Sequence, residues 1–174
     1  MPICVATTAA GVLAVFGSFD EQVHAVDAST GRAVWRYKTE SRIIGGAGWD
    51  AETATVFIGS MDAHVYALDG ATGALRWKFK TGAPVFSSPT ITRDHVLFGS
   101  NDGHLYCLRK DDGSLVWRFL EGRTGAISST PLVVGADRGS LVVFTSRTYQ
   151  NEADSHCTGS CVGPGDLIVL RPKA

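Results

Sequence analysis

Features that mark two large classes of protein are missing from this sequence of 174 residues. No run of apolar residues approaches the roughly 18 that a membrane-spanning helix requires. The formal net charge is -1, and lysine and arginine are scattered singly, so the basic stripe of a nucleic-acid-binding surface is absent. The sequence therefore predicts no membrane and no nucleic acid as a partner.

Cysteine is also scarce, with four residues: Cys4, Cys107, Cys157 and Cys161. Their number and spacing do not give a disulfide framework for a chain of this size. The opening residues lack the basic segment and the long apolar stretch of a secretory signal. From both observations we expect a reducing, cytoplasmic location.

Glycine, in contrast, is abundant, with 20 of 174 residues, about 11% against a typical value near 7%. Hydrophobic residues make up 44% of the chain and charged residues 19%, as in ordinary soluble domains. Helical periodicity appears nowhere. The composition therefore indicates an all-β protein with many tight turns between its strands.

A sequence of the form Gly-Ser-x-Asp occurs three times, and a tryptophan follows each of its glycines by 18 residues. The glycines are Gly17, Gly59 and Gly99, and the tryptophans are Trp35, Trp77 and Trp117. A repeat of this length matches the four short strands of one propeller blade. The sequence therefore predicts consecutive blades with these tryptophans on the outer strands.

Each block divides into short apolar or alternating segments that are separated by turn residues, as strands are. The third block predicts strands at 86–91, 95–100, 104–108 and 115–119, and the first block begins with a strand at 3–8. The fourth block supplies strands at 141–146 and 165–170 but no fourth strand and no tryptophan. We predict one domain over 1–174 with blades at 1–42, 43–84, 85–125 and 126–171 and an insertion at 147–164. Its four antiparallel blades would form half of a ring, or a small open or closed propeller.

Residues 25–35 and 67–77 share the pattern A-x-D-x-x-T-G-x-x-x-W. This pattern resembles the tryptophan docking motif of the PQQ-like (quinoprotein-type) β-propeller repeat family. The third copy departs from it with Cys107, Arg109 and Asp112 but keeps Gly113 and Trp117. That family includes quinoprotein alcohol dehydrogenases, an outer-membrane assembly lipoprotein and the propellers of aminoadipate-semialdehyde dehydrogenase-like proteins. The sequence of the third block resembles the propeller sequences of the last group.

The motif has a direct physical interpretation. Its aspartate caps the following turn by accepting backbone N–H groups, and its glycine permits a left-handed turn residue. The tryptophan then covers a small alanine of a neighbouring blade and buries a large ring between the two. We interpret these tryptophans as structural.

Two sets of equivalent polar residues recur between the second and third strands. His64 and His104 occupy matching positions, which Gln22 and Asp166 occupy in the other blocks. A ring of metal ligands and a set of turn-bonding side chains both fit this pattern, and we favour the turns. Asp20, Asp62 and Asp102 follow the repeat glycine by three residues and are interpreted as turn caps rather than acid–base groups.

The insertion at 148–164 breaks the repeat and contains His156, Cys157 and Cys161. A plain loop, a disulfide and a soft-metal site all fit these residues. A zinc site would need Cys4, Cys107 or another chain to complete its ligands.

No catalytic, cofactor-binding or metal-binding residue can be named from the sequence, and no cofactor is expected. We predict a non-catalytic propeller scaffold for protein–protein interaction or assembly. One alternative is an accessory propeller module of an acyl-activating enzyme, and another is half of a PQQ-dependent dehydrogenase. The expected partner is a second copy, which closes an eight-bladed ring, or a protein that supplies further blades.

Overall fold

Fifteen β-strands make up the part of the chain that the computed structural model describes, residues 3–8, 11–120, 125–135, 141–146 and 166–170. They are β1 (Cys4–Thr8), β2 (Gly11–Gly17), β3 (Gln22–Asp27), β4 (Ala33–Lys38), β5 (Gly48–Asp50), β6 (Thr55–Gly59), β7 (His64–Asp69), β8 (Leu75–Lys80), β9 (Thr90–Ile91), β10 (His95–Gly99), β11 (His104–Arg109), β12 (Leu115–Leu120), β13 (Leu132–Val134), β14 (Leu141–Ser146) and β15 (Asp166–Leu170). No helix among these residues is long and apolar enough to cross a membrane.

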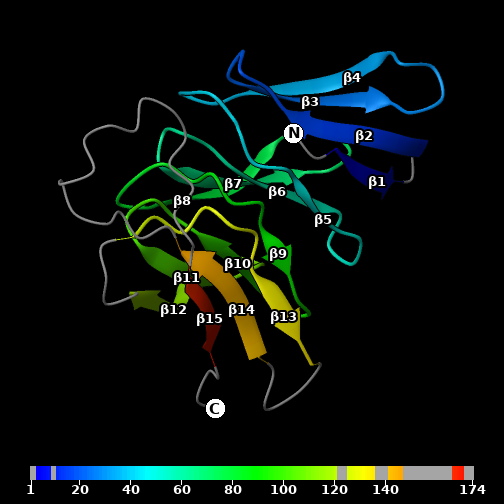
Figure 1. Ribbon diagram of the computed structural model, residues 1–174. Coiled ribbons are helices and arrows are strands. Elements are labelled where there is room, and N and C mark those ends of the chain that lie inside the picture. The colour runs from blue at the N-terminus through cyan, green and yellow to red at the C-terminus, as the bar shows by residue number, and fades with distance from the viewer. Residues whose placement is uncertain (1–2, 9–10, 121–124, 136–140, 147–165, 171–174) are drawn as a thin grey trace.

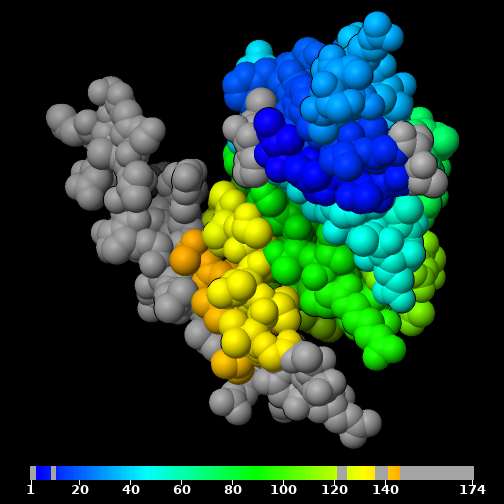
Figure 2. Space-filling view, turned by 90° about the vertical axis from the view of Figure 1, so that its right-hand side faces the viewer, coloured from blue at the N-terminus to red at the C-terminus, as the bar shows by residue number. Residues whose placement is uncertain are grey.

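The strands pair only with their neighbours in the sequence and form four antiparallel sheets. The first three sheets are β1–β4, β5–β8 and β9–β12, and the fourth contains β13, β14 and β15. They follow one another in chain order from the top to the bottom of the molecule (Figure 1). The space-filling view shows the first sheet forming the upper end (Figure 2). The described residues therefore form an open, partial propeller of four blades, which confirms the predicted fold class.

The repeat tryptophans lie on the last strand of each of the first three sheets, in β4, β8 and β12. Each sheet also has a bulge at the same place, just after the residue that pairs with its tryptophan: Ala25, Ala67 and Cys107. A bulge increases the local twist of a strand pair. The sequence repeat is therefore accompanied by a repeated backbone bulge. The predicted placement of the tryptophans on the outer strands is confirmed.

Each pair of neighbouring sheets encloses its own hydrophobic core. The first core contains Val15 and Trp35 from the first blade and Ile58 from the second. The second and third cores repeat this arrangement between the following blades, down to Phe144 in β14. Because strand residues alternate between faces, each blade offers one apolar face to the preceding blade and one to the following blade. Interfaces between blades are therefore the hydrophobic interior of this protein.

The first strand of the third blade is shorter than the predicted segment 86–91, since β9 covers only Thr90 and Ile91. Upstream of β9 the Ser87 hydroxyl donates to the Gly99 carbonyl oxygen (2.9 Å) and accepts the Gly99 N–H (2.8 Å). A side chain thus takes the place of a backbone ladder pair. The fourth blade repeats this device with Ser129 and the backbone of Thr145.

Candidate functional site

The interface between the first and second blades and the interface between the second and third blades contain equivalent contacts. The first of these contacts involves the repeat tryptophan. The Trp35 indole N–H donates to the Gly70 carbonyl oxygen of the second blade at 2.9 Å. The ring lies against Gly73, where an added Cβ would stand 2.6 Å from ring carbon Cε3. Gly73 has φ +73°, so the next blade presents a left-handed turn without a side chain to this ring.

The second interface repeats this geometry with Trp77. Its indole N–H donates to the Lys110 carbonyl oxygen at 3.0 Å, and its ring lies against Gly113, which has φ +72°. The sequence interpretation expected an alanine beneath the tryptophan. That contact stays a prediction, and the structure shows a further one: a glycine with positive φ lies against the ring in both interfaces.

The third copy of the motif has Lys110 where the second has Gly70, and the structure explains this departure. The Lys110 ammonium group is buried, 3.0 Å from Asp50 Oδ2 and 2.8 Å from Glu52 Oε2. It therefore joins the third blade to the β5–β6 hairpin of the second through a buried ion pair.

The repeat aspartates cap the turn between the second and third strands, as predicted. One oxygen of Asp20, Asp62 and Asp102 accepts a backbone N–H two residues later, each at 3.0 Å. This bond closes the turn before the third strand. The predicted capping role is confirmed for all three.

The second carboxylate oxygen has a role that sequence reasoning missed. Asp62 Oδ2 accepts the Tyr66 hydroxyl at 2.8 Å and also the Glu40 N–H at 2.9 Å. Glu40 belongs to the linker that leaves the first blade, so this bond crosses the interface. Asp102 repeats it with Tyr106 at 2.7 Å and with the N–H of Gly82, in the linker after the second blade, at 2.8 Å. The spacing of four residues between aspartate and tyrosine was the available signal.

His64 and His104 take part in the same turns. The ring Nδ1 of each lies 3.3 Å from the capping oxygen of Asp62 or Asp102, and each ring packs near the following tyrosine. Each histidine therefore interacts with the aspartate of its own turn. Within the described ranges, no three His, Cys, Asp or Glu side chains gather in a group that suits a metal ion.

Of the four cysteines, Cys4 and Cys107 lie among the described residues. Cys107 is buried in the third core, and burial raises the pKa of its thiol to about 12. Burial also raises the pKa of Cys4. Such shifts disfavour the nucleophilic thiolate. His156, Cys157 and Cys161 lie outside the described residues, and so does the rest of the insertion 148–164.

We predict that the motif aspartates make the protein sensitive to acid. The Arg76 guanidinium, with Thr72, holds the pKa of Asp69 at about 2, below its ordinary 3.8. A carboxyl whose pKa is lowered by folding stabilises the fold above its unfolded pKa, and this contribution is lost as the pH falls toward the folded value. Urea midpoints should therefore drop between about pH 4 and pH 2. Asp69→Asn should flatten this drop, and an unchanged slope would contradict the prediction.

One face of the first sheet is partly exposed, whereas the central residues of the matching face of the second sheet are buried. Ala6, Leu13 and Val15 face the second blade, so the alternate residues face away. This open face contains Val5, Val12, Ala14, Phe16, His24 and Val26. Val5 is 62% exposed and Val12 44%, whereas Ile58 and Leu68 of the second blade's matching face are fully buried.

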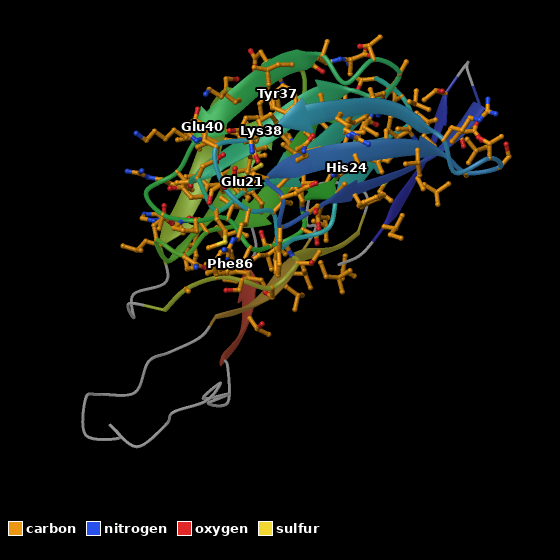
Figure 3. The ribbon with its side chains drawn as sticks, turned by 90° about the horizontal axis from the view of Figure 1, so that it is seen from above. Glu21, His24, Tyr37, Lys38, Glu40 and Phe86 are labelled. Carbon is orange, nitrogen blue, oxygen red and sulfur yellow. The ribbon has the colours of Figure 1, made fainter. Side chains whose placement is uncertain are left out.

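Seen from above, the first sheet lies in front with His24 on β3 (Figure 3). The His24 ring stacks on Phe16 with centroids 5.3 Å apart, as Tyr106 stacks on Phe98 at 5.4 Å in the third blade. Its Nε2 lies 2.8 Å from Asp20 Oδ2, where the other blades have a tyrosine hydroxyl. The open face thus has the geometry of a blade interface without a preceding blade.

Comparison with known proteins places this architecture in a family. No curated protein matches the chain. Among solved structures, BamB from Moraxella catarrhalis superposes with a TM-score of 0.68 at 27% identity, over 82% of this chain and 42% of that one. Sqt1 from Saccharomyces cerevisiae superposes with a TM-score of 0.70 over 83% of this chain and 42% of its own, and at 14% identity it shows the fold alone.

The chain thus spans about two fifths of the length of each of these structures. Residues 18–173 match the protein family described as outer membrane protein assembly factor BamB. That match takes in most of the chain and runs through all three cores between blades. The protein therefore belongs to this family of PQQ-like β-propellers.

Proposed function

We propose that this protein is a non-catalytic β-propeller scaffold that binds other proteins through its exposed sheet faces. The observation that carries the proposal is the open face, where Val5 is 62% exposed and Val12 44%, whereas Ile58 and Leu68, on the face that the second blade turns toward the first, are fully buried. Contiguous apolar surface rimmed by polar groups is typical of protein interaction sites. Lys38 and Glu21 form such a rim, with a 2.6 Å ion pair at the end of the first sheet (Figure 3).

The family supports a role in assembly. The description of the matched family is an outer membrane protein assembly factor, and the 27% identical structure is BamB. A role as a scaffold agrees with that description. The cytoplasmic location expected from the sequence stays a prediction.

Affinity capture with matched baits tests the function. Proteins retained by the wild-type chain should be lost with Val5→Lys, because a charge on the open face opposes burial against a partner. Leu75→Lys is the control, since Leu75 is 43% exposed on β8, away from the open face. Equal capture by all three baits would contradict the proposal.

The enzymatic alternative has its own test. A half of a PQQ-dependent dehydrogenase would bind the quinone with calcium and give a stoichiometric chromophore. We expect no such chromophore on titration of the chain with quinone and calcium. Its appearance would overturn the non-catalytic reading.

The two partners expected from the sequence separate by mass. An eight-bladed ring of two copies would have a mass of about 37 kDa, twice the 18.5 kDa of one chain. Light scattering at micromolar concentration measures this directly. A stable monomer would exclude the ring and leave a partner protein that supplies further blades.

A further inference from the structure

We propose that the outer edge of the third blade, strand β12, binds an extended segment of another protein as an added strand, and that this segment carries a carboxylate opposite Arg118 between two apolar residues. The site lies apart from the open face and goes beyond the proposed function. β12 is the last strand of its sheet and pairs on one side with β11 (Figure 1). No strand of the described ranges pairs with its other side.

The equivalent strand of the second blade shows which backbone groups point outward. The N–H of Thr81, directly after β8, donates to the Ala63 carbonyl oxygen at 2.8 Å. Residues that bond to the neighbouring strand alternate with residues that do not. The backbone groups of Lys78 and Lys80 therefore point away from β7, toward the outer edge.

β12 has the same orientation. Its pairing with β11 matches the pairing of β8 with β7 position for position, including the bulge. Arg118 and Leu120 stand where Lys78 and Lys80 stand in β8. Their backbone N–H and C=O groups therefore point outward, where they form a template for a further strand. Main-chain bonds to such a template supply affinity for an extended peptide.

The side chains at the edge distinguish β12 from the other outer strands. Natural edge strands are protected from further pairing by charged side chains, above all lysine. β4 ends in Lys38 and β8 ends in Lys80, whereas β12 ends in Leu120, which is 55% exposed. Leu115 and Val116 of β12 are 46% and 45% exposed. The third blade therefore lacks the terminal lysine and presents apolar side chains instead.

Arg118 is a cation without the neighbour that its equivalent has. In β8, Lys78 Nζ lies 3.5 Å from Oε1 of Glu40, in the linker after the first blade. The equivalent linker residue after the second blade is Gly82, whose N–H bonds to the third blade's repeat aspartate as that of Glu40 bonds to the second blade's. Gly82 has no side chain, and no carboxylate of the described residues pairs with Arg118. Its bond is to the neutral Tyr106 hydroxyl. A carboxylate on an incoming segment would take the place of Glu40.

The faces of β12 fix the sequence pattern of the partner. Trp117 and Phe119 pack in the third core, so Arg118 and Leu120 face the other way. Residues directly opposite each other in an antiparallel pair share a face. With an acidic residue opposite Arg118, the partner residues two positions before and after it meet Leu120 and Val116. The pattern is therefore apolar-x-acid-x-apolar.

A second copy of β12 does not have this pattern, because Arg118 stands at its centre. Antiparallel pairing of two such strands about Arg118 places the two guanidinium groups opposite each other. Like charges in that position destabilise a strand pair. The charge of the edge therefore favours a different segment with an acidic centre.

The probe is the peptide acetyl-Gly-Val-Thr-Glu-Thr-Val-Gly-amide, and its control has lysine in place of glutamate. The glutamate peptide at millimolar concentration should shift the amide resonances of Arg118 and Leu120. The lysine peptide should bind about 2–30-fold more weakly, because an opposite-charge pair becomes a like-charge pair. Methylation of the glutamate's backbone nitrogen should abolish binding, since that N–H donates to the Arg118 carbonyl oxygen in the added strand.

Two variants test the edge itself. Leu120→Lys gives β12 the terminal lysine of β4 and β8, so it should abolish binding and leave the thermal midpoint unchanged. Arg118→Glu should reverse the preference, so that the lysine peptide binds more tightly than the glutamate peptide. A general loss of folding would not produce such a reversal.

Several results would overturn the proposal. They are no shift with the glutamate peptide, equal binding of the two peptides, and undiminished binding by Leu120→Lys. Slow hydrogen exchange of the Arg118 and Leu120 amides in the free chain would also do so, because the edge would then already be paired. A wild-type dimer that Leu120→Lys dissociates would assign the edge to a second copy. Val5→Lys should leave peptide binding unchanged, so this site and the proposed function are tested separately.

Discussion

Replacing Trp35 with alanine is expected to lower the free energy of unfolding by about 3–5 kcal/mol. The ring is 8% exposed within the first core, and its N–H bonds to Gly70 in the next blade. The substitution removes apolar contacts, leaves a cavity against Gly73 and removes the donor from a buried carbonyl. Urea denaturation of the wild type and the variant measures the difference.

Two further variants separate the contributions. Trp35→Phe keeps an aromatic ring but loses the indole N–H, so it should cost less than Trp35→Ala. Trp77→Ala should also cost less, because Trp77 is half-buried whereas Trp35 is buried. Denaturation midpoints of Trp35→Ala equal to those of the wild type would show that the ring does not hold the two blades together.

Gly73→Ala is expected to destabilise the protein by about 2–5 kcal/mol. A left-handed backbone costs a residue with a Cβ about 1–2 kcal/mol. The new methyl group would also stand 2.6 Å from the Trp35 ring and force it to move, at an overpacking cost of about 1–3 kcal/mol. Unfolding by urea again provides the measurement.

Gly31→Ala is the matched control, because Gly31 has nearly the same φ but no neighbour within 4 Å of the added carbon. In the isolated chain it should show the backbone cost alone, about 1–2 kcal/mol. Equal losses for the two variants would mean that the tryptophan ring adds nothing at Gly73.

Strand positions and the places of the tryptophans could be predicted from the sequence because each is a local pattern repeated in register. The capping of turns by Asp20 and its equivalents was predictable for the same reason. Alternation and turn residues act over a few positions, and three copies reinforce one another. Local patterns were therefore sufficient to predict an all-β fold with four blades.

Contacts between blades were less predictable, because the sequence does not show which backbone group meets which side chain. The contact of the Trp35 ring with Gly73 was not predicted, because the residue pattern permits a positive φ at this glycine without showing what lies against it. The bond from the Glu40 N–H to Asp62 joins residues 22 apart and appears only once the blades are stacked. Replacement of β-ladder bonds by Ser87 likewise depends on a three-dimensional contact.

Strand pairing restricted to neighbours has a consequence for how the protein is made. Among the described residues, hydrogen bonds join positions no more than 58 apart, and the tryptophan bonds span only 35 and 33. A ribosome adds about 5–20 residues per second, so a 40-residue blade emerges in about 2–8 s. Hairpins form in about 1–10 μs, far faster than that. Each blade can therefore fold on its predecessor as it leaves the ribosome, and the order of synthesis becomes the order of folding.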